Sequence, residues 1–491
     1  MWGAANSTDT VMRTYDLDGR LTSYPLGNRG QSGLVRTVVY DSASRITQYT
    51  HVNGSGVAQP TYNHTFNYDN LDRLTGWGQN TTAYGWGYDN SGNRTSYEPG
   101  STTYTDTIAS TSNWLMSTNG PTPNRSNTYD ADGHLTADGT YTYTYSDRGR
   151  LASAKAGSST VGYLYNALDQ RVLKTGPTSI VSTGTQVYVY DESSHLLGEY
   201  SNSLAVVQET VFLGDAPIVV LTQTVSGSPA TTTTNVYNVY TDQIGAPRVI
   251  TQASSRKMAW RWDSADSYGV LAPNTNPAGL GTFAYNPRMP GQLFDAEDAL
   301  FYNINRNYDP ILGRYVQSDP IGLRAGINTY AYAGGNALTN FDSTGESVEW
   351  TGSLVGFGAA FIGGGSLYRF DFTSKCTCNI QVHIKGFASV LGLGVGIKGP
   401  IKGKLSDLGA SGGGLTMYSP SDCPDPDDGN GRASIAGINV ITGGGFSLGS
   451  AIQIGRLSNS ELFSPGMAGW DVSISAMIGA AAVVNSEKHC C

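Results

Sequence analysis

Segments in which apolar and polar residues alternate recur along most of the chain, and many of them end in a tyrosine followed by a polar turn. An alternation with a period of two is typical of a strand with one buried and one exposed face. The intervening turns are rich in Asp, Asn and Gly, the residues that adopt the tight backbone of hairpin connections. The pattern therefore predicts a succession of antiparallel β-hairpins.

The turns share one unit, in which Tyr-Asp is followed a few residues later by Arg or His and then by Leu or Ile. Copies or variants of this unit begin at Tyr15, Tyr40, Tyr68, Tyr88, Tyr129, Tyr145, Tyr165 and Tyr190. Most successive starts are 16 to 28 residues apart. One gap of 41 residues, between Tyr88 and Tyr129, predicts a degenerate copy in that interval.

A single hairpin of this length is marginally stable alone and is stabilised by pairing with the next one. We therefore predict an all-β fold, built as a coiled antiparallel ribbon of hairpins. The abundance of tyrosine agrees with this, because 28 of the 30 tyrosines lie before Ser347 and tyrosine favours strands. A conventional β-sandwich and a β-propeller remain open, although the repeat is shorter than the roughly 40–45 residues of a four-stranded propeller blade.

The charge of the chain argues against a nucleic-acid partner, since only 14% of its residues are charged and the formal net charge is −9, whereas such a partner needs a basic face. Met1–Thr10 has neither the basic nor the apolar part of a secretory signal. The least polar long stretch, Thr351–Tyr368, holds six glycines, so we predict no membrane helix of roughly 18–20 residues. We expect a secreted or cell-surface protein that is cytoplasmic before export and leaves by a route without an N-terminal signal peptide.

The most distinctive stretch is Arg288–Glu346, which is dense in Asp, Asn, Gly and Pro set among Tyr and Phe. It contains, in order, Pro290-Gly291-Gln292, Phe294-Asp295, Tyr302-Asn303, Arg306, Tyr308-Asp309-Pro310, Gly313-Arg314-Tyr315, Ser318-Asp319-Pro320-Ile321-Gly322-Leu323, Asn328-Thr329-Tyr330-Ala331-Tyr332, Asn336 and Asp342. In these motifs it resembles the core of Rhs proteins, the YD-repeat family that includes insecticidal toxin-complex shells and, more distantly, teneurins. The segment Asn238–Leu271 also resembles the family's H-x-D-x-x-G-x-P segment, with Tyr240 in place of the histidine.

Three charged residues of this stretch form a candidate catalytic site: Arg306, Asp319 and Asp342. The two carboxylates are separated by 22 residues, many of them turn formers, so the chain can fold back and bring them together. Two carboxylates in one site divide acid and base roles, because one holds a proton while the other stays ionised. The resemblance implies a self-cleaving aspartyl site, in which the pair activates water and protonates the leaving group while Arg306 lowers the pKa of one carboxyl group. The alternative is that both aspartates are turn or cap residues.

The resemblance also implies where the chain would be cut, just past a motif that in the family reads Asp-Pro-x-Gly-Leu. The cleavage region is therefore Gly345, Glu346 and Ser347. Here the motif is Asp342-Ser343-Thr344-Gly345-Glu346, with Ser in place of Pro and Glu in place of Leu. The extra carboxylate changes both the charge near the pair and the seating of the segment, so whether the site still cuts is open.

The composition changes abruptly at Ser347: the tail holds 27 of the 62 glycines, two tyrosines and all five cysteines. Alternations such as Leu391–Ile397 and Val472–Ile478 predict strands, in a tight barrel or closely stacked sheets. The cysteines leave two readings open, disulfides formed after export or a zinc site of Cys376, Cys378, His383 and Cys423. The acidic segment with Asp425, Asp427 and Asp428 faintly resembles a calcium loop but lacks its closing Glu. We predict no cofactor or resident metal, and we find no catalytic constellation in the tail.

These observations divide the chain into a YD-repeat shell (residues 1–287), an Rhs-type core (288–346) and a variable C-terminal domain (347–491). The resemblance implies a polymorphic-toxin fragment that carries a C-terminal effector and releases it by self-cleavage near Glu346. It implies as partners a secretion or delivery apparatus and an immunity protein; the Gly-rich, near-neutral tail adds a membrane as a target to test. Two alternatives remain: a non-cleaving structural or adhesive surface protein, and a displaced fragment with an inert tail.

The size of the ribbon predicts where the tail lies. At ordinary strand rise and spacing, the hairpins of residues 1–346 give on the order of 4,000 Å² of sheet. Enclosing a compact tail of this length needs roughly 7,000 Å². The sheet is therefore too small to close around the tail, and we expect the tail to lie beside an open, curved ribbon. The alternative is that upstream repeats complete the enclosure.

Overall fold

The computed structural model describes residues 11–345, apart from 18–19, 121–123, 229, 264–265 and 326, together with the backbone of the strands that lie between residues 348 and 490. The described residues form antiparallel strands and no α-helix, which confirms the predicted all-β class. Three short 3-10 turns complete the regular structure: η1 Pro60–Tyr62, η2 Gly322–Ala325 and η3 Ala333–Gly335. None of the helical turns in this part of the chain has the length or apolar character that a bilayer span requires.

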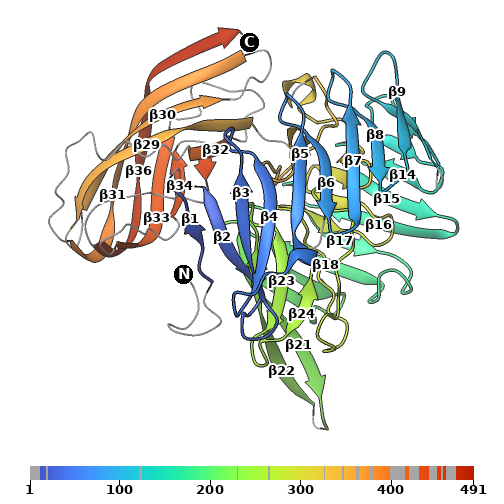
Figure 1. The fold of residues 1–491 in the computed structure, drawn as a ribbon, viewed down its shortest axis with the longest axis horizontal. Helices are drawn as coiled ribbons and strands as arrows, with labels where there is room; N and C mark the ends of the chain where they lie inside the picture. Colours follow the sequence, from blue (N-terminus) through green and yellow to red (C-terminus); the bar gives the residue numbers. More distant parts are fainter. Residues whose placement is uncertain are drawn as a thin grey trace.

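Two long antiparallel sheets make up the first half of the molecule (Figure 1). The 11-stranded sheet contains β1 Thr14–Tyr15, β2 Leu21–Leu26, β3 Leu34–Tyr40, β4 Ile46–Asn53, β5 His64–Tyr68, β6 Leu74–Gln79, β7 Thr82–Tyr88, β8 Arg94–Pro99, β9 Tyr104–Ile108, β10 Leu115–Asn119 and β11 Arg125–Ser126. The 13-stranded sheet contains β12 Thr128–Tyr129, β13 Leu135–Ala137, β14 Thr142–Tyr145, β15 Leu151–Ala156, β16 Ser159–Tyr165, β17 Arg171–Thr175, β18 Thr185–Tyr190, β19 Leu196–Ser201, β20 Val206–Leu213, β21 Ala216–Ser226, β22 Thr231–Thr241, β23 Pro247–Gln252 and β24 Met258–Arg261. Each strand pairs with its neighbours in sequence, as expected for a ribbon of hairpins.

The predicted repeat coincides with the strand boundaries. Each tyrosine that begins a unit is the last residue of its strand, as Tyr68 is of β5 and Tyr88 of β7. The degenerate copy predicted between Tyr88 and Tyr129 is also present, because β9 ends at Ile108 and a turn at Ala109 leads into β10. Here isoleucine and alanine replace the tyrosine and aspartate of the unit. The 11-stranded sheet ends shortly after this copy, at β11.

The unit has a physical basis that the hairpin of Asp69 illustrates. One Asp69 oxygen accepts the backbone N–H groups of Leu71 and Arg73, and the other accepts the Arg73 guanidinium at 2.7 Å. The Arg73 guanidinium lies over the ring of Tyr88, the tyrosine of the next unit, at 4.6 Å. The Tyr88 hydroxyl then donates to the carbonyl oxygen of Leu74 at 2.8 Å. This unit thus closes its own turn and is tied to the next one by a cation–π contact and a hydrogen bond, and the units of Tyr15 and Tyr40 repeat the cation–π contact.

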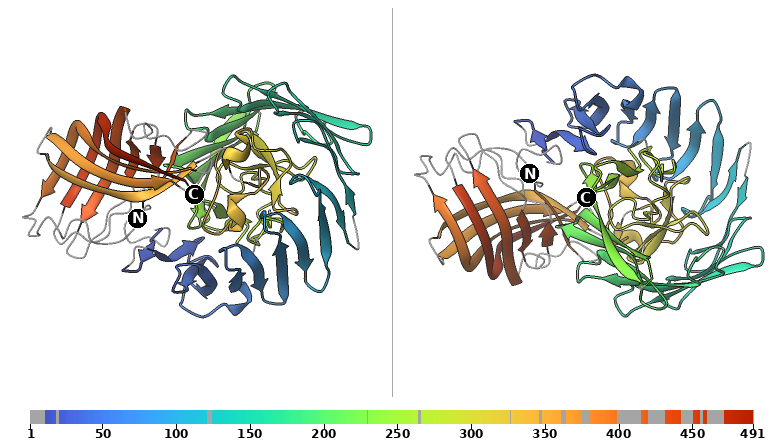
Figure 2. Two further views of the ribbon diagram at one scale, coloured as in Figure 1. Left: turned by 90° about the horizontal axis from the view of Figure 1, so that it is seen from above. Right: turned by 90° about the horizontal axis from the view of Figure 1, so that it is seen from below.

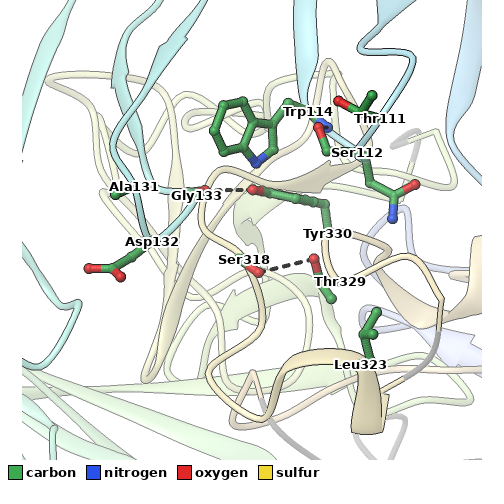
Figure 3. A pocket seen from close by; sticks show the side chains of 11 residues that line it. Thr111, Ser112, Trp114, Ala131, Asp132, Gly133, Ser318, Leu323, Thr329 and Tyr330 are labelled. Carbon is green, nitrogen blue, oxygen red and sulfur yellow. Dashed lines mark hydrogen bonds between the residues drawn. The ribbon is translucent and has the colours of Figure 1, made fainter.

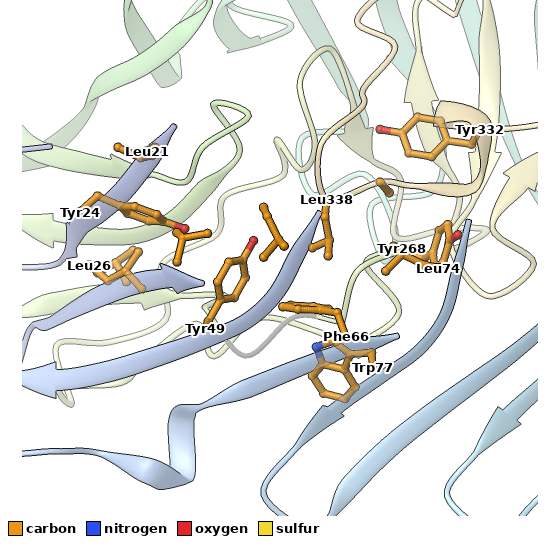
Figure 4. Packing of buried hydrophobic residues seen from close by; sticks show 14 of the residues in the cluster. Leu21, Tyr24, Leu26, Tyr49, Phe66, Leu74, Trp77, Tyr268, Tyr332 and Leu338 are labelled. Carbon is orange, nitrogen blue, oxygen red and sulfur yellow. The ribbon is translucent and has the colours of Figure 1, made fainter. Parts of the chain in front are cut away.

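The two sheets form one curved wall whose first hairpins return to its last ones. Tyr24 on β2 donates a hydrogen bond to Gln243, in the turn after β22, at 3.0 Å. Leu21 and Tyr24 pack in one buried cluster with Val249 and Met258 from the far end of the wall (Figure 4). This single wall differs from the face-to-face sheets of a sandwich and from the separate blades of a propeller.

The interior of the wall is filled by the chain that follows the second sheet (Figure 2). Between Asp266 and Gly345 this chain is mostly irregular, with one four-stranded sheet. That sheet consists of β25 Leu293–Phe294, β26 Phe301–Asn303, β27 Arg306–Asp309 and β28 Arg314–Tyr315. We call residues 266–345 the plug. A fully buried ion pair, Arg171 of the wall with Asp295 of the plug at 2.6 Å, joins the two.

The tail is also made of strands, as its alternating sequence predicts. They are β29 Val348–Ala360, β30 Gly364–Ser374, β31 Ile380–Lys398, β32 Leu415–Ser419, β33 Gly431–Ile441, β34 Ser450–Ile454, β35 Leu457–Asn459 and β36 Asp471–Cys490. The first strand pairs with both β30 and β32, so the sheet closes on itself. It lies outside the curved wall in the views of Figures 1 and 2, as the size of the ribbon predicts.

Several predictions for the tail concern residues outside the described part of the chain. These are Cys376, Cys378, Cys423 and Cys491, the acidic segment with Asp425, Asp427 and Asp428, and, at the start of the tail, Glu346 and Ser347. The disulfide and zinc alternatives therefore stay predictions.

Candidate functional site

The structure brings Arg306, Asp319 and Asp342 together. Arg306 begins β27, and its side chain is 3% exposed. One guanidinium nitrogen, Nη2, lies 2.8 Å from Oδ2 of Asp319 and 3.1 Å from Oδ2 of Asp342. The ring of Tyr315 lies beneath this guanidinium, 3.6 Å away. The two carboxylates are thus held on a single nitrogen atom.

Asp319 lies in the loop after β28 and is as buried as Arg306, at 3%. Its backbone N–H donates to the carbonyl oxygen of Thr329 at 2.8 Å, and its Oδ1 accepts the backbone N–H of Ile321 at 3.1 Å. Arg306 Nη1 donates to the same Thr329 carbonyl at 3.2 Å. One oxygen of Asp319 therefore closes a local turn while the other meets Arg306.

Asp342 also uses one carboxylate oxygen for a local turn and the other for Arg306. Its Oδ1 accepts the backbone N–H of Gly345 at 2.7 Å, and its Oδ2 accepts the Tyr315 hydroxyl at 2.9 Å besides Arg306. Burial, with the nearby Asp342 carboxylate, raises the pKa of Tyr315 well above its ordinary value, so this hydroxyl stays protonated as a donor. Both aspartates are thus turn residues, as the second reading expects, and they also belong to one charged cluster. Their role in self-cleavage stays a prediction.

The segment from Asp342 to Gly345 lies along the turn that joins β26 to β27. The Asn303 amide donates to the carbonyl oxygen of Asp342 at 2.7 Å. Two groups of Asn305, its backbone N–H and its side-chain amide, donate to the carbonyl oxygen of Thr344 at 3.1 and 3.0 Å. The segment is thereby bound at two alternate carbonyls, as a paired strand would be.

Two glycines leave room for this arrangement. Gly345 has a φ of +78°, and a Cβ there would lie 2.9 Å from the carbonyl oxygen of Asn303. Gly291 has a φ of +77°, and a Cβ there would lie 1.9 Å from the carbonyl oxygen of Ser343. Both backbones are in the left-handed region, and both approaches are too close for any side chain.

Some of these site residues could be found from the sequence and others could not. The motifs that carry the resemblance include Gly291, Asn303 and Tyr315, although the sequence assigned them no role. Asn305 belongs to none of those motifs, and its position shows only in three dimensions. In the predicted cleavage region, the structure describes Gly345, whereas Glu346 and Ser347 lie outside the described residues.

The loop that carries Asp319 docks on the wall beside a cavity of about 290 Å³ (Figure 3). Trp114 and Gly133, from two turns of the wall, and Ser318 and Tyr330, from the plug, line it. The Tyr330 hydroxyl donates to the Gly133 carbonyl at 2.6 Å, and Ser318 bonds Thr329 at 3.0 Å. The Tyr330 contact fixes the loop on the turn of the unit that begins at Tyr129, beside Trp114 of the degenerate copy. Within the described residues, no three His, Cys, Asp or Glu side chains are grouped as metal ligands.

Comparison with known families gives one match over most of the chain. Residues 3–325 match the teneurin YD-shell family. The matched range includes the wall, Arg306 and Asp319, and it ends before Asp342.

Individual relatives match shorter parts. The putative uncharacterized protein YibJ of Escherichia coli is 45% identical over 80 residues, which are 16% of this chain and 33% of that protein. The toxin protein Tse5 of Pseudomonas aeruginosa is 37% identical over 107 residues, 22% of this chain and 8% of Tse5. The double-stranded DNA deaminase toxin A of Burkholderia cenocepacia is 28% identical over 235 residues, 42% of this chain and 16% of the toxin. The chain thus spans a third or less of the length of each of these relatives.

Proposed function

The chain belongs to the teneurin YD-shell family, and we propose that it is the shell and core of a polymorphic toxin that cuts itself between Glu346 and Ser347. The cut would release the C-terminal domain, residues 347–491, as an effector. One observation carries the proposal: Asp319 and Asp342 share a single guanidinium nitrogen of Arg306, and Asp342 begins the segment that leads into the predicted cleavage region.

The chemistry needs only water and the two carboxyl groups. One carboxylate removes a proton from a water molecule, whose oxygen adds to the scissile carbonyl carbon. The other carboxyl group gives its proton to the leaving nitrogen as the C–N bond breaks, so the products are a carboxyl group and an amine. Arg306 stabilises the ionised member of the pair, and burial strengthens this effect by excluding water.

Two kinds of similarity support a toxin rather than a purely structural protein. The core motifs resemble those of Rhs proteins, and two of the relatives are toxins by name. By that likeness the chain would work with a delivery apparatus, would be exported, and would need an immunity protein against its effector. The tail would act on a membrane or another target, and no nucleic acid is expected as a partner of the shell.

The test is the intact mass of the purified protein. We expect two fragments, one ending at Glu346 and one beginning at Ser347, without added protease. Asp319→Asn and Asp342→Asn should each leave the chain uncut. The matched control is Asp106→Asn, since Asp106 is also a buried aspartate, with a hydrogen bond from Thr118 at 2.6 Å, and takes no part in the site.

A single intact species in the wild-type protein would contradict the proposal. Cleavage that persists in either aspartate variant would assign the cut to another agent. If the wild-type protein stays intact, the remaining interpretation is a non-cleaving structural or adhesive YD-repeat protein.

A further inference from the structure

One arginine of the wall departs from the pattern of its repeat. In the unit that begins at Tyr145, Ser146 stands where most other units have aspartate. Its hydroxyl accepts the backbone N–H of Arg150 at 3.2 Å, so the turn still closes. A hydroxyl carries no charge, however, and it does not fix the guanidinium as Asp69 fixes Arg73.

The Arg150 guanidinium reaches the plug instead. Its Nη1 donates to the backbone carbonyl of Asn305 at 3.0 Å, and its Nη2 donates to the side-chain carbonyl of the same residue. Nη2 also lies 3.1 Å from Asp169, in the turn of the next unit. Arg150 is 7% exposed. A buried, charged donor of the wall therefore holds both carbonyl groups of one plug residue.

This contact fixes which way the Asn305 amide points. Because Arg150 can only donate, the side-chain oxygen of Asn305 faces it, and the side-chain nitrogen faces the other way. That nitrogen and the backbone N–H converge on the carbonyl of Thr344. Arg150, Asn305 and Thr344 form one chain of hydrogen bonds from the wall to the segment that leads into the cleavage region.

The turn that carries Asn305 is held in a strained conformation by its contacts with the wall. The preceding residue, Ile304, has a φ of +48°, a conformation that strains a β-branched side chain. Ile304 is buried against the wall with Tyr188. A second contact joins the plug to the same turn of the wall: the side-chain amide of Gln317 donates to the backbone carbonyl of Gly149, the residue before Arg150, at 3.3 Å. Strain of this kind persists only where the surroundings hold it, and here the surroundings include the wall.

We infer that Arg150 and Asn305 are positioning residues for the self-cleavage, and that the cut is therefore coupled to docking of the wall on the plug. The inference rests on the proposed function for its activity, but the positioning of Thr344 is a separate, measurable property. Before the wall docks on the plug, Asp319 and Asp342 could come together while the segment Asp342–Gly345 is still out of place. The chain would then be cut only after the shell has assembled.

Asn305→Asp separates positioning from docking. The aspartate keeps its acceptor oxygens for Arg150 and gains an ion pair, so the wall should dock at least as firmly. It loses the side-chain donor to Thr344 and sets a carboxylate against that carbonyl. We expect an unchanged melting temperature and self-cleavage slowed about tenfold to a hundredfold at neutral pH.

Two arginines of the wall test whether the wall helps to position the cleavage segment. Arg148 and Arg150 both pair with Asp169, at 2.7 and 3.1 Å, but it is Arg150 that donates to Asn305. We expect Arg150→Ala to slow the cut about tenfold or more and Arg148→Ala to leave it unchanged. If Arg150 acts through Asn305, the double variant Arg150→Ala with Asn305→Asp should be no slower than the slower single variant.

Hydrogen exchange makes the inference testable whether or not the chain cuts. The Gly345 amide donates to Asp342 at 2.7 Å, so in an uncut Asp319→Asn background we expect it to be protected while its segment is held. We expect Arg150→Ala to speed its exchange, and Arg148→Ala to leave it unchanged. Equal cleavage rates and equal exchange in the two arginine variants would overturn the inference while leaving the proposed function intact. A wild-type chain that never cuts would overturn the proposed function alone, provided that the exchange still differs.

Discussion

Asp342 uses its two oxygens for two tasks: one closes the turn that ends at Gly345, and the other meets Arg306 and Tyr315. The position of the segment is therefore linked to the charge of the pair. A change in the residues just after this turn should alter catalysis without touching the aspartates.

Glu346→Leu is the residue-scale test of that link. Glu346 follows Asp342 by four residues, so we expect its carboxylate to add a like charge that opposes ionisation of the base. Leucine, which the resembling family has at this position, removes the charge and offers an apolar side chain. We expect the variant to cut faster, about tenfold, as followed by gel densitometry over time. Glu346→Gln is the control that removes only the charge, and equal rates in wild type and both variants would contradict this account.

The residues of the candidate site that could be predicted from the sequence are those whose side chains are themselves acids, bases or charges. Carboxylates and a guanidinium are recognisable as a catalytic set, so Arg306, Asp319 and Asp342 could be selected. Asn305 could not be, because its role comes from the orientation that Arg150 imposes and from its distance to Thr344. Asparagine in a turn is ordinarily explained by turn geometry alone.

At the scale of single elements, strand ends were predictable because the Tyr-Asp unit encodes its own turn. The aspartate bonds two backbone N–H groups and the arginine four residues later, all of which are local in sequence. What the unit does not encode is its curvature or its partner across the wall. The packing of β2 against the turn after β22, for example, joins residues more than two hundred positions apart.

Two buried histidines near that junction predict a pH dependence. His51 accepts a hydrogen bond from Arg36 at 2.9 Å, and His64 accepts one from Trp77 at 3.1 Å. Arginine and the indole N–H can only donate, so both imidazoles are neutral. Burial, with the positive charge of Arg36 beside it, lowers the pKa of His51 to about 2 and lowers that of His64 well below its ordinary value.

The sign of the effect follows from these lowered values. Above the ordinary histidine pKa of about 6.5, neither the folded nor the unfolded chain binds the protons. Below it, the unfolded chain binds protons that the folded chain does not, so stability falls as the pH drops from about 6.5, by up to about 1.4 kcal/mol per pH unit for each histidine. Urea titrations between pH 7 and pH 4 should show this loss.

The double variant His51→Gln with His64→Gln should reduce that slope. His195→Gln is the contrasting control. Although burial opposes it, hydrogen bonds to Asp215 and Asp191 raise the pKa of His195. Its stabilisation is therefore complete below about pH 6.5 and is lost as the pH rises through the raised value. An unchanged acid slope in the double variant would show that other groups cause the loss.

At the scale of the whole molecule, the amount of sheet predicted from the repeats placed the tail outside the wall, where the structure has it. The estimate did not anticipate what the wall encloses instead. The plug has few strands and an irregular path, and its place is set by contacts between residues far apart in sequence. Neither periodicity nor turn chemistry specifies such contacts, which is why the interior could not be predicted.

Because the wall encloses the plug, removing one partner of an ion pair between them should be costly, since it leaves a buried charge without its counter-charge. Asp295 is fully buried and lies 2.6 Å from Arg171 and 2.7 Å from Lys174, both on β17. Although burial raises it, the charges of Arg171 and Lys174 lower the pKa of Asp295, so the three groups are charged together. Removing the carboxylate leaves the buried Arg171 without this ion pair, whereas Lys174 keeps the carboxylate of Glu297 at 2.9 Å.

We therefore expect Asp295→Ala to lower the free energy of unfolding by about 3–5 kcal/mol, the usual cost of an uncompensated buried charge. Asp72→Ala is the control, since Asp72 pairs with Arg45 at the surface with 66% of its side chain exposed and should cost little. Urea unfolding followed by tryptophan fluorescence measures both, because Trp260 and Trp262 are buried beside the plug. If the two variants lost equally little stability, the ion pairs of Asp295 would contribute little to docking of the plug. The docking would then rest on its other contacts with the wall, such as those of Arg150 with Asn305.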